Sequence, residues 1–170
     1  MDEQDQEDME KHLEDLTGIT SYVMEMCGHL MMVYGAKIEN LIIEKMLPKF
    51  GAILQNPNAF ETETIDALCF TCDVMEYGGE KLFNMVQPNA VAVFNQLTAK
   101  HKDNEDTDII QTIIYGYGIM ATKMTPEAYK PLLPTVMQMC ETALQHPEAE
   151  GDRIVFTENV IGAMGKLTYF

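Results

Sequence analysis

Residues 74–94, VMEYGGEKLFNMVQPNAVAVF, contain the pattern that decides the fold. An apolar helical stripe ends at Tyr77, two glycines follow, and a second apolar run surrounds Pro88. Glycine and proline are the residues that end helices and open turns, so the stretch predicts two helices joined by a tight turn. One such pair cannot bury its apolar faces alone, so we expect further pairs to pack beside it.

The same pattern recurs along the chain. Leu47-Pro48, Gln87-Pro88 and Leu133-Pro134 each open a similar apolar run, and the prolines lie 40 and 46 residues apart. The helices that precede these runs also share a recurring methionine, at Met32, Met75, Met120 and Met164. The steps between them are 43, 45 and 44 residues. A two-helix unit every 40 to 47 residues is the signature of HEAT and armadillo repeats. Because proline has no N–H, we expect each proline in the first turn of the second helix of its pair.

Apolar residues at three- and four-residue spacing predict helices along nearly the whole chain. These helices cover residues 7–34, 38–54, 64–77, 81–98, 107–124, 128–145 and 153–169. The predicted fold is all-α, an α-solenoid of about three and a half antiparallel HEAT helix pairs. The pairs are expected at 7–55, 62–99 and 107–146, with a partial pair at 153–170 and an acidic tail at 1–6. We expect the chain to be a segment of a longer solenoid.

Composition narrows the classes of function. The chain has 170 residues, 11 lysines and arginines against 27 acids, and a formal net charge of −16. This charge would repel DNA or RNA and disfavours anionic membranes, whereas it favours basic protein partners. No apolar run approaches the ~20 residues of a membrane span, and the N-terminus lacks the apolar core of a secretory signal. The composition predicts an intracellular protein with reduced cysteines.

Three short motifs match known sites by their letters, and each has a simpler structural interpretation. The C-x-x-C at residues 69–72 lacks the further ligands of a zinc site, so we expect it to pack in the core. The G-x-G-x-x-A at 116–121 matches a dinucleotide fingerprint in a helical context, where small residues would let two helices approach closely. The acidic stretch 103–108 lacks the glycine and glutamate of an EF-hand and should form an exposed loop.

No arrangement of side chains predicts catalysis. The histidines have no serine or cysteine partner in a catalytic pattern, and we expect solvated or helix-capping positions for His12, His29, His101 and His146. Most of the fourteen methionines fall at helical spacing and are expected in the core, although exposed methionines would form an adaptable binding surface. The prediction is a protein without enzymatic activity, cofactor or metal.

Three stretches, in order, give the chain a resemblance to a known family. The sequences DALCFTCDVME at 66–76, YGYGIMA at 115–121 and TENVIGAMGK at 157–166 resemble motifs of importin-β (karyopherin-β) nuclear transport receptors. They match the C-terminal HEAT repeats of that much longer family. The importin-five group, whose members import ribosomal proteins and histones, is the most similar within the family. The resemblance covers nearly the whole chain.

This resemblance implies a binding protein that shuttles between the cytoplasm and the nucleus. In such receptors the first helix of each pair lines the convex face and the second lines the concave face. The implied partners are basic cargo of the ribosomal-protein or histone type, the Ran GTPase, and the Phe-Gly repeats of nucleoporins. Polar residues on second helices are the candidate concave contacts: Gln87, Asn95, Gln96, Gln138, Glu141 and Gln145. The alternative is a HEAT-repeat scaffold or adaptor unrelated to nuclear transport.

Overall fold

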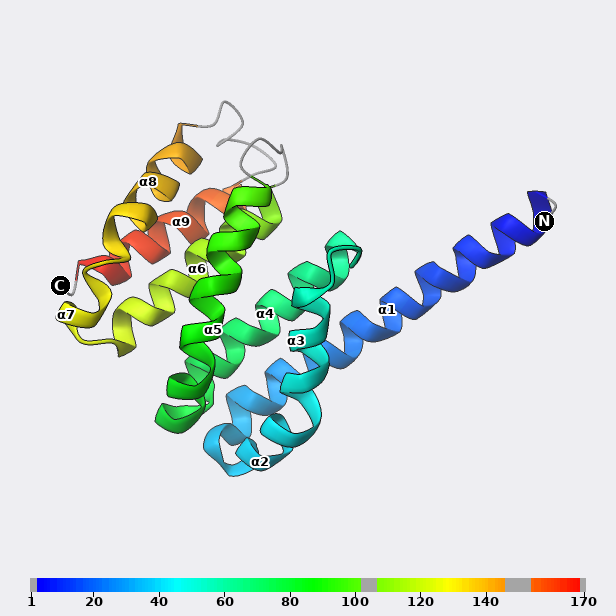
Figure 1. The fold of residues 1–170 in the computed structure, drawn as a ribbon, viewed down its shortest axis with the longest axis horizontal. Helices are drawn as coiled ribbons and strands as arrows, with labels where there is room; N and C mark the ends of the chain where they lie inside the picture. The colour runs from blue at the N-terminus through cyan, green and yellow to red at the C-terminus, as the bar shows by residue number, and fades with distance from the viewer. Residues whose placement is uncertain (1–2, 102–106, 146–153, 169–170) are drawn as a thin grey trace.

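The structure of the chain is a computed structural model that describes residues 3–101, 107–145 and 154–168. Side chains are described for residues 18–101, 108–145 and 156–168. Within these ranges the chain is helical and contains no strand, which confirms the predicted all-α class (Figure 1).

Four helices follow one another in a row (Figure 1). They are α1 (Glu3–Tyr34), α4 (Glu61–Tyr77), α6 (Thr107–Lys123) and α9 (Ile154–Leu167). α1 packs on α4, α4 packs on α6, and α6 packs on α9, so that α1 and α9 stand at the two ends of the row. Each of these helices contains one of the methionines that recur every 43 to 45 residues. Residues one period apart in the sequence therefore lie on helices that pack against each other.

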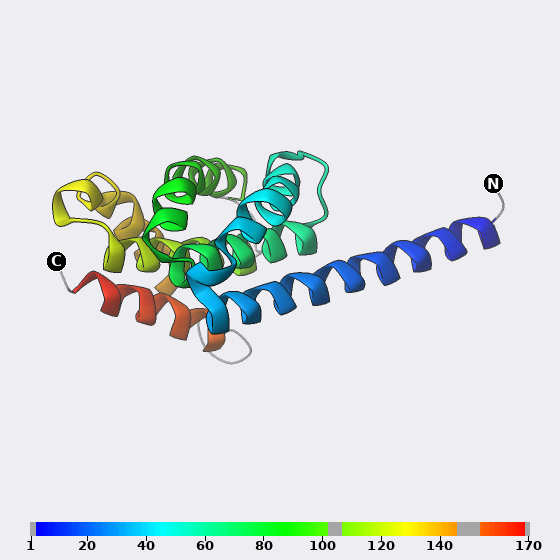
Figure 2. The same cartoon turned by 90° about the horizontal axis from the view of Figure 1, so that it is seen from below.

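The other long helices form a second layer against this row (Figure 2). α3 (Leu47–Gln55) contacts α4, α5 (Gly79–Lys100) contacts α4 and α6, and α8 (Leu133–Leu144) contacts α6 and α9. Side chains from both layers share one apolar core, in which Leu68, Phe94 and Ile113 are fully buried. The core is therefore continuous along the row.

Polar contacts also connect the helices of the row. The Tyr115 hydroxyl of α6 donates to the Glu76 carboxylate of α4 at 2.6 Å, and Lys123 Nζ donates to the Glu76 carbonyl oxygen at 2.6 Å. The ammonium group of Lys166, in α9, stands 4.4 Å from the centroid of the Tyr115 ring. One cluster therefore connects α4, α6 and α9.

The segment after α1 differs from the single helix predicted over 38–54. It is built from a 3₁₀ turn η1 (Gly35–Ile38), α2 (Glu39–Leu41), a π turn η2 (Ile42–Met46) and α3. Gly35 opens it with φ of +50°, a conformation that suits glycine. Pro48 lies in the first turn of α3, as predicted. Because Pro48 has no N–H, an α-helical bond to Glu44 is impossible, and the π turn directly before α3 accommodates this break.

The other repeat prolines give one confirmed prediction and one error. Pro134 lies in the first turn of α8, as predicted, whereas Pro88 lies inside α5. The prediction failed at Pro88 because α5 begins at Gly79, directly after Gly78 and well before the proline. The helix predicted at 128–145 is also divided: α7 (Pro126–Tyr129) ends before Pro131, whose missing N–H interrupts the helical bonding.

Gly116 and Gly118 confirm the prediction of close helix packing. A Cβ atom at Gly116 would stand 2.6 Å from the ring of Phe94, and one at Gly118 would stand 3.1 Å from the Cα of Ala163. Both glycines lie within α6 rather than at a strand-to-helix turn, so the dinucleotide interpretation does not apply.

Single-residue predictions had mixed outcomes. Cys72 is buried, as predicted, but Cys69 is exposed and the prediction for it was wrong. His101 is not solvated but occupies the C-cap position of α5, the other of its two predicted placements, and its burial there lowers its pKa. Among the methionines whose side chains the structure describes, five are buried in the core: Met24, Met31, Met75, Met120 and Met139. In the same part of the chain, Met26, Met32 and Met137 are exposed, against the core prediction, and Met85 is exposed as well.

Several predictions concern parts of the chain outside the described residues. They include the acidic tail at its first two residues, most of the acidic loop at 103–108, and the helix break at 146–151. The side chains of His12 and His146 also lie outside the described part.

Candidate functional site

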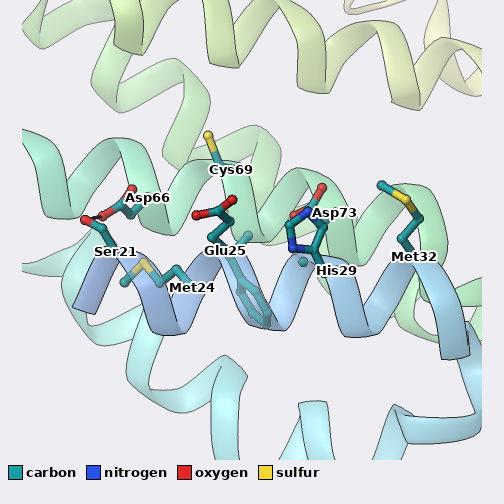
Figure 3. A pocket seen from close by; sticks show the side chains of 10 residues that line it. Ser21, Met24, Glu25, His29, Met32, Asp66, Cys69 and Asp73 are labelled. Atoms are coloured by element: carbon teal, nitrogen blue, oxygen red, sulfur yellow. Dashed lines mark hydrogen bonds between the residues drawn. The ribbon is translucent and has the colours of Figure 1, made fainter. Parts of the chain in front are cut away.

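The cleft between α1 and α4 is the candidate site with the most charged lining. Its volume is about 410 Å³. Figure 3 shows the side chains of α1 and α4 that line it. We call it the acidic cleft and define it by Ser21, Glu25, His29, Asp66, Cys69 and Asp73. The three α1 residues recur every four positions, and the α4 residues lie three and four apart, so each set shares one helix face. Met24 and Phe70, both buried, also line the cleft and supply apolar surface.

The carboxylates of the acidic cleft differ in their surroundings. The Ser21 hydroxyl donates a hydrogen bond to Asp66 Oδ2. Asp73 points toward Gly28 of α1, where any side chain would collide with its carboxylate. Burial raises the pKa of Asp73 to about 6, with a further increase from Glu76 and an opposing effect from His29. No lysine or arginine is among the described residues that line the cleft, so no positively charged side chain of the lining neutralises its carboxylates.

Negative charge is concentrated on the two helices that form this cleft. The segments of α1 and α4 contain 13 of the 27 acids and a single basic residue, Lys11. By contrast, residues 35–55, 79–100 and 126–145, which supply the second layer, contain six lysines and five glutamates. Most of the net negative charge therefore lies on α1 and α4, at one end of the row, and not on the second layer.

The stability of the fold is expected to depend on pH through Asp73. Its folded-state pKa of about 6 lies above the ordinary value of 3.8, so the folded chain binds this proton more tightly than the unfolded chain. The free energy of unfolding is then largest below about pH 4 and falls as the pH rises through about 6. Asp73→Asn should therefore raise it by about 1 kcal/mol near neutral pH, after allowance for solvent screening, and change little near pH 3.5.

Urea unfolding of both proteins across this pH range measures the effect. A variant that is less stable than the natural chain at neutral pH would show that the ionised carboxylate makes favourable contacts, against this expectation.

A second cleft, between α8 and α9, brings together three of the six predicted concave residues. Gln138, Glu141 and Gln145 line it, and its volume is about 520 Å³. Gln145 Nε2 donates to Glu141 Oε1 at 3.3 Å, so these two exposed side chains already interact. Met137 and Met164 supply apolar surface to the same cleft.

The other three predicted residues are placed separately. Gln96 lines a groove of about 630 Å³ between α3 and α5, with an apolar lining that includes Phe50, Val86 and Val93. Asn95 is exposed and accepts a hydrogen bond from the Tyr117 hydroxyl at 3.1 Å, while Gln87 is half-buried. Neither Asn95 nor Gln87 lines the clefts described above. A binding role for all six residues stays a prediction.

The acidic cleft was not predicted, although the sequence contains a signal for it. Glu25 and His29 are four residues apart, and Asp66 and Asp73 are seven apart, so each pair returns to one helix face. No lysine or arginine occurs between Lys11 and Lys37 or between Lys49 and Lys81. What the sequence did not reveal is that these two helices lie side by side with the acids facing one cleft.

The chemistry of the acidic cleft suits the binding of cations. Although Cys69 is exposed as a residue, desolvation around its thiol and the neighbouring carboxylates raise the pKa of that thiol, which keeps it protonated and weakly nucleophilic. Within the described residues, no group of three or more His, Cys, Asp or Glu side chains is placed to hold a metal ion. The carboxylates instead offer acceptors for lysine or arginine side chains.

Two further findings bear on the site. In the part of the chain that the structure describes, no helix has the length and apolar character needed to cross a membrane. Comparisons with protein families, curated proteins and solved structures gave no match for this chain.

Proposed function

We propose that this chain is a protein-binding module of an importin-β-type nuclear import receptor, built as a HEAT superhelix, and that it acts by binding rather than by catalysis. The observation that supports this most is the contact between helices one repeat period apart: α1 with α4, α4 with α6, and α6 with α9. An array of this kind offers long surfaces to extended partners. The three quoted motifs supply the family resemblance.

The acidic cleft is the proposed site for a basic segment of cargo. A lysine or arginine has an apolar stem and a charged head, and the cleft offers surfaces for both. Met24 and Phe70 would contact the stem, while Asp66 and Asp73 would accept hydrogen bonds from the head. An arriving cation would also offset the free-energy cost of the partly buried Asp73 carboxylate, so binding and ionisation of this group should favour each other.

The remaining partners follow from the proposed receptor role. Cargo of the ribosomal-protein or histone type would be basic, Ran would bind in its GTP state, and nucleoporins would present Phe-Gly repeats. The receptor would shuttle between the cytoplasm and the nucleus. The cleft with Gln138, Glu141 and Gln145 supplies polar side chains for further contacts with an extended cargo chain.

Neutralising the acidic cleft should weaken binding of a basic partner about tenfold. The change is Asp66→Asn with Asp73→Asn, which removes two negative charges with little change of volume. The matched control is Glu80→Gln with Glu127→Gln, which removes the same charge from the second layer and should change binding less than about twofold. The measurement is fluorescence anisotropy with a labelled, lysine- and arginine-rich histone tail peptide. Equal losses in the two variants would assign binding to overall charge and would remove the cleft from the proposal.

Capture by Ran separates the two candidate functions. A receptor that contains this chain should bind GTP-loaded Ran and not GDP-loaded Ran. Binding of the basic peptide with indifference to both forms of Ran would instead favour the scaffold or adaptor alternative.

A further inference from the structure

An apolar groove of about 630 Å³ separates α3 from α5 in the second layer. We call it the α3–α5 groove and define it by Leu47, Gly51 and Leu54 of α3 and Met85, Val86 and Val93 of α5. Both helices pack on α4, whose Thr71 also lines the groove, but they do not pack closely on each other (Figure 2). Additional repeats of a longer solenoid would stack beyond α1 or α9, so they would leave this groove open.

Gly51 keeps the α3 wall of the groove open. It lies in the middle of α3, where glycine is less favourable than alanine because it loses more backbone freedom on folding. Packing within the chain does not require a glycine here, since a Cβ atom at this position would meet nothing within 4 Å. Gly116 differs, because a Cβ atom there would collide with the ring of Phe94. The glycine in α3 therefore leaves space at the groove wall that the fold itself does not fill.

The walls of the groove carry a net positive charge in a strongly acidic chain. Residues 43–55 and 81–100, which supply these walls, contain four lysines and one acid, Glu44. One of the lysines, Lys81, is paired with Glu39 of α2. By contrast, α1 and α4 together contain 13 acids and a single lysine. The groove and the acidic cleft therefore differ in the sign of the charge around them.

The other three lysines flank the two ends of the groove. Lys45 and Lys49 lie within one helical turn of Pro48, and Lys100 lies about one turn beyond Gln96. Pro48 and Gln96 line the groove, and all three lysines are exposed. Because α3 and α5 run in the same direction in Figure 1, the two sets of lysines stand at opposite ends. The lining between them is apolar or amide-bearing and contains no charged side chain.

We propose that the α3–α5 groove binds an acidic amphipathic helix of a partner protein. Apolar side chains along one face of such a helix would enter the groove, while carboxylates beside them would face the lysines at its two ends. The lining of α5 extends from Met85 to Gln96, which is about 16.5 Å at 1.5 Å per residue. This length matches about three turns of a bound helix, whose apolar positions would be i, i+4, i+7 and i+11.

The overall charge of the chain makes the groove selective for such a partner. A helix that carries several carboxylates is repelled by a chain with a net charge of −16, so binding outside the groove is disfavoured. The lysines at the ends of the groove reverse this repulsion locally. The groove shares no lining residue with the acidic cleft, so an acidic helix and a basic segment would not compete for the same side chains.

Fluorescence anisotropy with a labelled synthetic peptide tests this inference. The peptide is a helix of about five turns, with leucine at i, i+4, i+7 and i+11 and glutamate at most other positions. We expect saturable binding that Gly51→Gln weakens about tenfold, because the new side chain occupies the groove. The matched control Gly162→Gln, at an open glycine of α9, should change binding less than about twofold. Glutamine forms helices better than glycine, so both variants should fold. A peptide that does not bind, or binding that tolerates Gly51→Gln, would overturn the proposal.

A second pair of variants tests the acidic character of the partner. Lys45→Gln with Lys49→Gln should weaken binding of the glutamate peptide about fivefold, whereas Lys37→Gln with Lys130→Gln, at exposed lysines outside the groove walls, should change it less than about twofold. Equal losses would assign binding to overall charge and contradict the proposal. A peptide with lysine in place of each glutamate should be insensitive to Gly51→Gln. An equal loss for both peptides would mean that the groove recognises apolar surface alone, against the proposed partner. These experiments use neither Ran nor the histone tail peptide, so their outcome is independent of the proposed receptor function.

Discussion

Replacing Tyr117 by alanine is expected to lower the free energy of unfolding by about 3 to 5 kcal/mol, the range for truncation of a fully buried aromatic side chain. Tyr117 is 1% exposed, and its ring packs edge-on against Phe94 with the centroids 5.3 Å apart. Its hydroxyl donates to Asn95 of α5, and its carbonyl oxygen accepts a hydrogen bond from the Tyr129 hydroxyl of α7 at 3.1 Å. Truncation therefore leaves a cavity where α5, α6 and α7 meet.

The conservative variant Tyr117→Phe separates the ring from the hydroxyl. It keeps the packing and removes one hydrogen bond, so we expect a loss of about 1 kcal/mol. Urea denaturation followed by circular dichroism at 222 nm measures both variants. A loss below about 1 kcal/mol for the alanine variant would mean that the neighbouring side chains collapse into the space, and that Tyr117 is not a key contact between the two layers.

Gly116→Val should destabilise the fold by about 3 kcal/mol, at the upper end for overpacking of a core. A Cβ at this position would stand 2.6 Å from two atoms of the Phe94 ring and 3.1 Å from Cys72 Sγ. Phe94 is fully buried and cannot swing away, because its ring also packs against Tyr117. Valine adds two methyl groups beyond that Cβ, so α6 would have to move away from α4 or α5.

The matched control is Gly165→Ala in α9, where a Cβ atom would meet nothing within 4 Å. This position is exposed and helical, so alanine should raise the free energy of unfolding by up to about 1 kcal/mol through its helix propensity. The two substitutions should therefore change the free energy of unfolding in opposite directions, and the same thermal or urea experiment measures both. A stability loss of similar size in both variants would contradict the distinction between crowded and open glycines.

The all-α class and most helix positions were predictable because they depend on local periodicity. Apolar spacing placed the helix that ends at Tyr77 correctly, and the paired glycines after it marked the turn. Pro48 and Pro134 were also placed correctly in first turns, but Pro88 was not, since a proline signals a restriction without revealing where its helix begins. The π turn before α3 has no clear signature in composition and was missed.

The candidate site was less predictable than the fold. Three of the six residues proposed as contacts share one cleft, because Gln138, Glu141 and Gln145 recur at helical spacing along α8 and its C-cap. The acidic cleft instead combines Glu25 with Asp66 and Asp73, which lie 41 and 48 residues further along the sequence. Which faces of α1 and α4 meet depends on packing, and the absence of a side chain at Gly28 gives the Asp73 carboxylate its space. Periodicity within one helix cannot reveal such a juxtaposition.

The row of helices has a consequence for synthesis on the ribosome. Each helix of the row packs on one that follows 43 to 45 residues later, so a helix that has emerged must wait for its neighbour. At translation rates of 5–20 residues per second, this delay is about 2 to 9 s per step. The nascent chain would therefore fold in stages from α1 toward α9, and at each stage the apolar flank of the newest helix would be the surface open to a chaperone.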